Sequence, residues 1–398
     1  MVTNKSKKPE LRFKGFSDDW EQRKFFEIAQ RESLVRFSTA DFPSVEYEDV
    51  SPETGTLNKD IQSKEIEKKG FTFDNDNILY GKLRPYLHNW LNPNFSGVAV
   101  GDWWVLKPIR VDKNFLYMLI QTQKFDNIAN QSAGSKMPRA DWNHVSNASF
   151  MIPKNIDEQR RIGSYFESLD NLITLHQSKC DKLKIIKKLM LNNLFPKNGE
   201  KNPKWRFNGF NDDWEQRKLE DFVSFYSGLT YTPDDVRDSG TLVLRSSNVK
   251  DGEITLDDNV YVSPETVNSE NVKPGDLVVV VRNGSRNLIG KHAQIKHLMH
   301  NTVIGAFMTG IRSEHAEFVN ALLDTPRFKR DVDINIGATI NQITGYMFSH
   351  MEFMVPSERE QDQIGAFFRD LDHLITLHQS EVERLKKVKQ FFLDKMFI

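Results

Sequence analysis

The residues best suited to bind phosphate or a metal ion gather between positions 284 and 300, in two groups that approach known motifs without completing them. The segment Gly284–His292 holds the two glycines and the lysine of a phosphate-binding loop. However, five residues separate its glycines where the motif has four, and His292 stands where a serine or threonine must reach magnesium. His292, His297 and His300 lie close together, but no Asp or Glu near them completes a hard-metal site. We therefore expect a structural or phosphate-facing role for the three histidines.

Other catalytic motifs are incomplete or missing. Asn92-Pro-Asn-Phe95 is similar to the Asn-Pro-Pro-Phe/Tyr signature of adenine amino-methyltransferases, but it lacks the second proline, and no glycine-rich cofactor loop follows a predicted strand. The sequence has no Gly-x-Ser-x-Gly nucleophile elbow and no clean cluster of nuclease carboxylates. Its single cysteine, Cys180, excludes an intramolecular disulfide and a zinc site built on several thiolates, so we expect a buried or half-buried free thiol. The sequence therefore predicts a chain that is not an enzyme by itself and binds no metal or cofactor.

Two windows of the sequence are nearly free of acidic residues. Residues 277–313 contain no Asp or Glu, although these make up 55 of the 398 positions of the chain. Residues 77–111 contain one acid, Asp102, together with Lys82, Arg84, Lys107 and Arg110. Buried strands also exclude acids, and this explanation stays open, but such strands would exclude Arg and Lys as well. The two windows therefore favour nucleic acid as the partner.

Loops in these windows carry the groups that recognise DNA bases. Loops 81–88 and 282–287 combine glycine with guanidinium and amide groups, which make bidentate contacts to guanine and adenine in the major groove. Loops 134–139 and 337–342 occupy equivalent places before the last predicted strand of each half. The Lys and Arg side chains of the loops could also contact the phosphates of the DNA backbone. Because the two copies differ in sequence, they would read different bases. The predicted DNA-binding residues are Lys82, Arg84, Tyr86, His88, Ser135, Lys136, Arg139, Arg245, Arg282, Asn283, Ser285, Arg286, Asn287, Lys291, Asn341 and Gln342.

The elements that position these loops occur twice in the chain. Residues 9–25 and 203–219 are identical at twelve of seventeen positions, at an offset of 194. The block LITLHQS occurs at residues 172–178 and again at 374–380. Two copies of about 200 residues, alike at their ends and divergent in their middles, predict two domains of one fold related by an approximate two-fold axis.

Each copy ends in a predicted long helix. The first spans residues 157–194 and would be about 57 Å long at 1.5 Å per residue. Apolar side chains recur at steps of mostly three and four, which is typical of a coiled-coil seam. An isolated helix of this kind would expose its seam, so we expect the two helices to pair with each other; packing of each helix onto its own domain is the alternative. The predicted seam residues are Ile162, Phe166, Leu169, Ile173, His176, Leu183, Ile364, Phe368, Leu371, Ile375, His378 and Leu385. The two histidines are expected to be a polar pair that fixes the register rather than a metal or catalytic site.

A mixed α/β segment precedes each helix. Strand-like runs broken by Gly and Pro clusters occur at 77–80, 103–106 and 277–281, whereas 113–130 and 315–333 have helical patterns. The expected fold class is α+β, with two similar mixed α/β domains in tandem, two long antiparallel helices that form a coiled coil, and pseudo-two-fold symmetry. The expected boundaries are 1–152 for the first domain, 153–197 for the first helix, 198–355 for the second domain and 356–398 for the second helix.

The doubled pattern resembles the specificity subunit of type I restriction-modification systems. The resemblance rests on RFxGFxxxWExxK, on a Met-Ile/Val-Pro strand, and on EQxxI followed by a leucine-patterned helix, each present in both copies. It implies that two target recognition domains each read one half of a bipartite sequence in double-stranded DNA, and that the paired helices set the distance between the half-sites. It also implies two methyltransferase subunits that use S-adenosylmethionine, and two motor-endonuclease subunits that use ATP and Mg²⁺. All three cofactors are then expected on the partner subunits.

The composition of the chain is compatible with this interpretation. Lys and Arg total 54 against 55 Asp and Glu, giving a net charge of -1, which by itself argues against a DNA binder. A chain that closes on DNA within a larger complex, however, can use positive charge on its partners. No apolar run approaches the length of a membrane span, and the N-terminus lacks the apolar region of a signal peptide, so we expect a cytoplasmic protein without membrane contact. A coiled-coil adaptor with protein-binding lobes and a self-sufficient DNA methyltransferase with unrecognised motifs are the alternatives.

Overall fold

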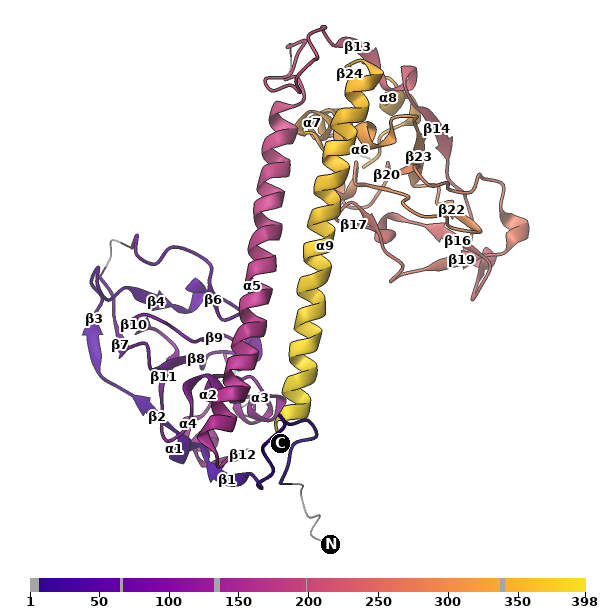
Figure 1. The fold of residues 1–398 in the computed structure, drawn as a ribbon. Helices are drawn as coiled ribbons and strands as arrows, with labels where there is room; N and C mark the ends of the chain where they lie inside the picture. Colours follow the sequence, from indigo (N-terminus) through magenta and orange to yellow (C-terminus); the bar gives the residue numbers. More distant parts are fainter. Residues whose placement is uncertain (1–6, 65–66, 132–136, 198, 337–340) are drawn as a thin grey trace. The chain divides into compact units, whose positions relative to one another are not determined.

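The computed structural model describes residues 7–64, 67–131, 137–197, 199–336 and 341–398, which form two compact units. The first unit comprises the described residues up to Ser178 together with 379–398, and the second comprises those from Lys179 to His378. Each unit therefore combines one globular α/β part with portions of the two long helices, α5 (Ile156–Asn193) and α9 (Glu358–Met396) (Figure 1). The domain boundaries expected from the sequence separate the globular domains from the helices, whereas each compact unit includes parts of both helices. The expected boundaries therefore stay a prediction.

The globular part of the first unit is built on two four-stranded sheets. One has the strand order β2–β11–β8–β9 and is antiparallel throughout. The other has the order β3–β7–β10–β4, in which β10 and β4 are parallel with Val98 beside Ser44. A two-stranded ladder pairs β1 with β12, and a short one pairs β5 with β6. The strands are β1 (Glu21–Lys24), β2 (Ala29–Glu32), β3 (Val35–Phe37), β4 (Ser44–Glu46), β5 (Val50–Ser51), β6 (Thr56–Leu57), β7 (Lys69–Phe73), β8 (Ile78–Gly81), β9 (Trp90–Leu91), β10 (Gly97–Val100), β11 (Trp103–Pro108) and β12 (Ser149–Ile152).

The second unit repeats this plan with one change of topology. Its antiparallel sheet β14–β23–β20–β21 and its ladder β13–β24 correspond to those of the first unit. Its other sheet, β15–β19–β16–β22, also contains a parallel pair, in which β16 and β22 are the equivalents of β4 and β10. In the first unit the next antiparallel strand pairs with β10, whereas in the second unit it pairs with β16, the equivalent of β4. The sequence divergence of the middles thus accompanies a different strand order. The strands are β13 (Glu215–Lys218), β14 (Ser224–Ser227), β15 (Val236–Arg237), β16 (Thr241–Leu244), β17 (Val249–Lys250), β18 (Glu253–Ile254), β19 (Val260–Val262), β20 (Leu277–Val280), β21 (His292–Gln294), β22 (Thr302–Ile304), β23 (Met308–Arg312) and β24 (Glu352–Val355).

Short helices cover the sheets, and threonines divide them. The segment 113–130 forms two helices because the Thr122 side chain caps the second by accepting a hydrogen bond from the Phe125 N–H. Thr325 accepts the equivalent bond from Phe328 and divides 315–333 in the same way. The short helices are α1 (Phe25–Ile28), α2 (Lys113–Leu119), α3 (Gln123–Ala129), α4 (Trp142–Asn147), α6 (Ala316–Asp324), α7 (Pro326–Asn335) and α8 (Gly345–Ser349).

The two long helices pack antiparallel within each unit. In the first unit, the N-terminal part of α5 lies beside the C-terminal part of α9 (Figure 1). The rings of Tyr165 and Phe392 meet edge-on there, 5.1 Å apart between centroids. Leu169 and Leu385 belong to the same buried cluster as the side chains of α2 and α3. In the second unit, the C-terminal part of α5 packs with the N-terminal part of α9, and Leu191 shares a core with Phe368 and α6. The expectation of two similar α/β domains with an antiparallel pair of long helices is confirmed.

A buried ion pair attaches an N-terminal segment to the start of a long helix in each unit. Arg12 donates two hydrogen bonds to Glu158, at 2.6 and 2.8 Å, and Arg206 donates two to Glu360, at 2.8 and 2.7 Å. The side chains of Glu158 and Glu360 are each 1% exposed. These pairs join the repeated RFxGF and EQxxI motifs, which explains why both motifs occur in both copies.

The predicted seam residues are not equally buried. Ile162, Phe166, Leu169, Ile364, Phe368, Leu371, Ile375 and Leu385 are buried, whereas Ile173, His176, Leu183 and His378 are half-buried. Cys180 is buried as a free thiol. Within the described residues, no helix combines the length and the apolar character needed to span a lipid bilayer.

Candidate DNA interface

Three loops meet at one edge of the antiparallel sheet in the first unit. The loop that follows β8 bridges the segment before α4 through Leu83 and Arg139, and the Arg84 N–H donates to the Pro138 carbonyl at 2.7 Å. The turn before β11 joins them because the Lys82 N–H donates to the Asp102 carbonyl at 2.9 Å. The structure thus brings together two loops that are far apart in the sequence, with Leu83 and Arg139 at an offset of 56 positions, and that were predicted separately to bind DNA.

Asp102 pairs with two cations of this cluster, Arg139 and Lys82. Its carboxylate accepts two hydrogen bonds from Arg139, at 3.0 and 3.1 Å, and lies 3.6 Å from the Lys82 ammonium. The hydrogen bonds from Arg139 hold the pKa of Asp102 below its usual value, so the carboxylate is ionised at neutral pH. Asp102 was noticed in the sequence only as the single acid of its window, and its place among the cations could not be seen there.

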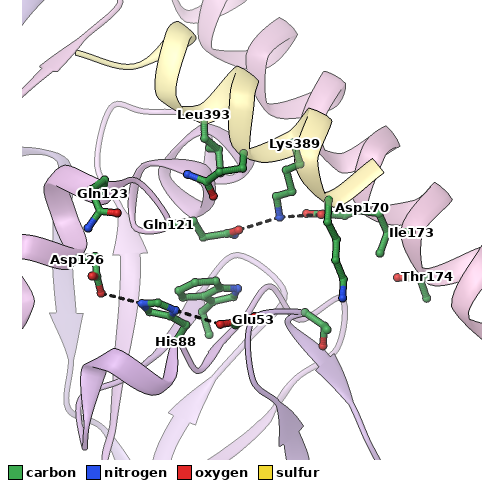
Figure 2. A pocket seen from close by; sticks show the side chains of 14 residues that line it. Glu53, His88, Gln121, Gln123, Asp126, Asp170, Ile173, Thr174, Lys389 and Leu393 are labelled. Atoms are coloured by element: carbon green, nitrogen blue, oxygen red, sulfur yellow. Dashed lines mark hydrogen bonds and ion pairs between the residues drawn. The ribbon is translucent and has the colours of Figure 1, made fainter. Parts of the chain in front are cut away.

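In the rest of the first loop, two residues have strained backbones, and the side chains differ in the direction they take. Arg84 and His88 flank a short 3₁₀ turn (Pro85–Leu87), and both have left-handed backbones, with φ of 47° and 55°. Tyr86 between them is exposed. His88 is directed toward a pocket, where its ring stacks on Trp90 and its Nε2 lies 3.0 Å from Asp126 (Figure 2). Tyr86 is therefore better placed for DNA than His88, whereas Arg84 is half-buried.

The second unit forms the equivalent cluster with other side chains. Arg282 bridges Gln342, and the Asn283 N–H donates to the Asn341 carbonyl at 3.2 Å. The Val281 N–H donates to the carbonyl of Phe307 at 3.0 Å, as the Lys82 N–H does to Asp102, so Phe307 takes the position of Asp102. Its ring is exposed and lies under the Arg282 guanidinium, 4.8 Å from ring centroid to Cζ. The two clusters thus share a backbone arrangement and differ in the chemistry they present.

Other predicted residues of the second unit are held by neighbours or stand at the surface. Arg286 donates to the Asp333 carbonyl at 2.7 Å, Arg245 pairs with Asp258 at 2.8 Å, and Asn283 donates to the Ser246 hydroxyl at 2.9 Å. Ser285 and Asn287 are exposed, and Lys291, Asn341 and Gln342 are half-buried. The predicted residues Ser135 and Lys136 lie outside the described residues. Direct contact with DNA stays a prediction for all of them.

The segment that approached a phosphate-binding loop has a different structure. Gly284–His292 runs through a 3₁₀ turn (Arg286–Leu288) into β21, and no α-helix follows it to point its N-terminus at a phosphate. His292 is buried, with Nδ1 3.1 Å from the Gly290 carbonyl. Across the described residues, no group of His, Cys, Asp and Glu side chains is arranged to hold a metal ion.

Equivalent lysines, called the lysine bridges below, fix the globular part of each unit to the helices. In the first unit, Lys389 of α9 lies 2.7 Å from Asp170 of α5 and donates to Gln121 at 2.8 Å (Figure 2). In the second unit, Lys187 of α5 lies 2.6 Å from both Asp372 of α9 and Asp324. An offset of 202 relates Lys187 to Lys389 and Asp170 to Asp372, and an offset of 203 relates Gln121 to Asp324. These are the offsets of the sequence repeats, so the repeats contained the signal that could have predicted the lysine bridges.

The lysine bridges differ in charge. Burial alone would lower the pKa of Lys187, but the charges of Asp324 and Asp372 raise it. Burial raises the pKa of Asp372 in spite of Lys187, and it raises the pKa of Asp170 in spite of Lys389. The second unit thus has two carboxylates around one lysine where the first has one carboxylate and one amide.

Comparison with known proteins gives a consistent result. The family model of the type I restriction modification DNA specificity domain matches residues 17–184 and 211–387. The chain is 23% identical over 297 residues to the type I restriction enzyme MjaVIII specificity subunit of Methanocaldococcus jannaschii, which covers 71% of this chain and 68% of that protein. It is 24% identical over 188 residues to the EcoKI specificity subunit of Escherichia coli, covering 45% of this chain and 40% of that protein. The crystal structure of a type I restriction-modification S subunit from M. genitalium has the same fold, with a TM-score of 0.70, 13% identity, and coverage of 98% of this chain and 99% of that one.

Proposed function

The chain belongs to the type I restriction modification DNA specificity family, and we propose that it is the DNA-recognition subunit of such a complex, with one half of a bipartite target read by each unit. The observation that carries the proposal is the loop cluster that occurs once in each unit. Leu83 with Arg139 and Arg282 with Gln342 form equivalent bridges, while Asp102 and Phe307 differ at the equivalent third position. Equal frameworks with unequal side chains suit two half-sites of unequal sequence.

Catalysis and cofactors are assigned to other subunits. Specificity subunits are non-catalytic components of type I systems. We place S-adenosylmethionine on methyltransferase subunits, and ATP with Mg²⁺ on motor-endonuclease subunits. The course of Gly284–His292 into a strand supports this assignment, because it lacks the helix N-terminus that a nucleotide phosphate needs. An adenine to be methylated would leave the duplex for the pocket of the methyltransferase. Such a complex acts on DNA in the cytoplasm.

The repeated long helices support two copies of the methyltransferase subunit per chain. Leu172 and Leu175 of α5 are 43% and 48% exposed, and their equivalents Leu374 and Leu377 of α9 are 41% and 53% exposed. These leucines stand at identical places in the repeated block LITLHQS, and their exposure is not explained by packing within either unit. They suit one kind of partner that binds twice. Two motor-endonuclease subunits would join the complex through these methyltransferases.

The leucine pairs allow the stoichiometry to be tested. Replacing Leu172 and Leu175 by Ser should remove one of two bound methyltransferase subunits, as measured by native mass spectrometry of the co-produced complex. Exposed Ile185, replaced by Ser, is a control on the same helix outside the repeated block. Retention of two methyltransferase subunits in the double variant would contradict the assignment.

Mapping of methylated adenines tests the proposed function itself. The chain would be produced with its methyltransferase subunit in a host without other adenine methylation, and the genome would be sequenced by a single-molecule method. We expect one bipartite motif of two unequal half-sites separated by a fixed spacer. Methylation by the chain alone would instead indicate a self-sufficient methyltransferase, and absence of any motif from the complex would refute the proposal.

A further inference from the structure

We propose that Asp102 determines specificity in the first unit, by accepting a hydrogen bond from the amino group of a cytosine in the half-site that this unit reads. The inference rests on the proposed DNA-recognition function and adds a residue, a base and a hydrogen bond to it. It is drawn from the position of Asp102 in the loop cluster and from the residue that replaces it in the second unit.

The position of Asp102 is that of a base-reading group. Its backbone carbonyl joins the turn before β11 to the loop after β8, which is the same junction that Phe307 makes in the second unit. The Asp102 side chain is 24% exposed, so it lies at the surface of the cluster and is not enclosed in the core. It is also the only acid in residues 77–111, a window that otherwise has the composition of a DNA-facing surface.

The surroundings of Asp102 fix the direction of its carboxylate. Arg139 Nε and Nη2 bind both oxygens, which locks the rotation of the carboxylate group. A carboxylate has about four lone-pair positions, so two hydrogen bonds from Arg139 leave acceptor capacity on each oxygen. The Lys82 ammonium at 3.6 Å compensates part of the negative charge. Asp102 can therefore approach DNA without the full repulsion from phosphates that an isolated carboxylate would experience.

The chemistry of the carboxylate selects the base. An ionised carboxylate only accepts hydrogen bonds, and cytosine N4 presents a donor in the major groove without an adjacent acceptor on the same base. Guanine and thymine present acceptors there, which a carboxylate repels. Adenine presents a donor beside the N7 acceptor and suits an amide better than a carboxylate. Phe307 has no hydrogen-bonding group, so the second unit cannot make this contact from the equivalent position.

Two substitutions at Asp102 distinguish base reading from charge balance. D102A should remove the preference for cytosine at one position of one half-site, with a loss of discrimination of about tenfold or more. D102N should move the preference at that position from cytosine toward adenine, because an amide offers a donor and an acceptor that match adenine N6 and N7. In the second unit, F307A is the matched control, and it should leave the first half-site unchanged.

The experiment uses the complete chain with its methyltransferase subunit. The motif of the wild-type complex is obtained by adenine-methylation mapping, and duplexes with each of the four bases at every position of the first half-site are then compared in competition binding. Relaxation at one cytosine in D102A, together with a shift toward adenine in D102N, supports the inference. Unchanged base preference, or a uniform change in affinity across all duplexes, overturns it and makes Asp102 a structural counter-ion. A wild-type complex without any bipartite motif would refute the proposed function itself.

Discussion

The lysine bridge of the second unit makes the sharpest prediction about what holds a globular part on the helices. Replacing Lys187 by Met keeps an apolar chain of similar length but removes the positive charge shared by Asp324 and Asp372. The two carboxylates, whose side chains are 27% and 25% exposed, then face each other without a lysine between them. His292 lies 3.7 Å from Asp324, and the charges of Lys329 and Lys296 act on Asp324 and Asp372 without an ion pair to either carboxylate.

The size of the effect follows from burial and from the number of carboxylates. Removing one partner of a fully buried ion pair costs about 3–5 kcal/mol, and partial exposure reduces this, so we expect K187M to lose about 2–3 kcal/mol of unfolding free energy. The equivalent change K389M leaves one carboxylate, Asp170, beside the neutral amide of Gln121. Its loss should be smaller, about 1–2 kcal/mol, because no second negative charge repels Asp170.

The dependence on pH provides a further check of this reasoning. Lys187 lowers the pKa of both carboxylates, so its removal moves both folded-state pKa values upward, and the pKa of Asp372, which burial already raises, moves further above the unfolded value of about 3.9. A carboxyl group with a raised folded-state pKa destabilises the fold above that pKa, and this cost disappears as the pH falls toward the unfolded pKa. The difference between wild type and K187M should therefore shrink from pH 7 toward pH 4.

Urea unfolding followed by circular dichroism would measure these differences, and hydrogen exchange resolved by peptide would assign them to a unit. K187M should accelerate exchange in α6 and in the N-terminal part of α9, and D324N with D372N in the K187M background should restore much of the stability. Equal losses in K187M and K389M, or a K187M loss that does not shrink at lower pH, would refute the reasoning.

Three other predictions concern recognition, spacing and assembly of the fold. Insertion or deletion of a few residues within 176–190 should change the spacer of the methylation motif and leave both half-sites unchanged; altered half-sites would contradict a measuring role for the helices. Arg84→Ala or Arg286→Ala should each weaken binding to the cognate duplex by about 1–3 kcal/mol if the guanidinium contacts a base, and unchanged affinity and specificity in a fluorescence anisotropy titration would remove that residue from the interface. Glu158→Gln should cost about 2–4 kcal/mol in urea unfolding because it leaves the mostly buried Arg12 without its hydrogen-bonded carboxylate, whereas replacing both residues by Met should cost less, and the reverse order would contradict a charge-based role.

The repeats in the sequence predicted the architecture because the repeated residues form the contacts that hold each unit together. The motifs RFxGF and EQxxI recur since Arg12 with Glu158 and Arg206 with Glu360 join them in space. The seam spacing predicted the long helices within one residue at each end of α5. The break at Thr122 was missed because its capping hydrogen bond is formed by a local backbone arrangement that a helical pattern of apolar residues does not reveal.

The candidate site could be predicted only in part. The acid-poor windows led to loops that the structure brings together within each unit, but the bridge between Leu83 and Arg139 depends on tertiary pairing. His88 illustrates the limit: its type and its loop predict DNA contact, and the sequence does not reveal that its Nε2 lies 3.0 Å from Asp126. The two units differ in strand order, because β7 pairs with β10 whereas β19 pairs with β16. These strands lie in the parts of the two copies that differ in sequence, so the repeats could not predict the difference.

The central claim is that each unit reads its own half of a bipartite DNA target. Its most direct test is to exchange residues 26–150 for the corresponding segment of another member of the family and to map adenine methylation in cells that also contain the methyltransferase subunit. One half-site should change, while the other half-site and the spacer length stay the same. A change in both half-sites, or in neither, would contradict the account.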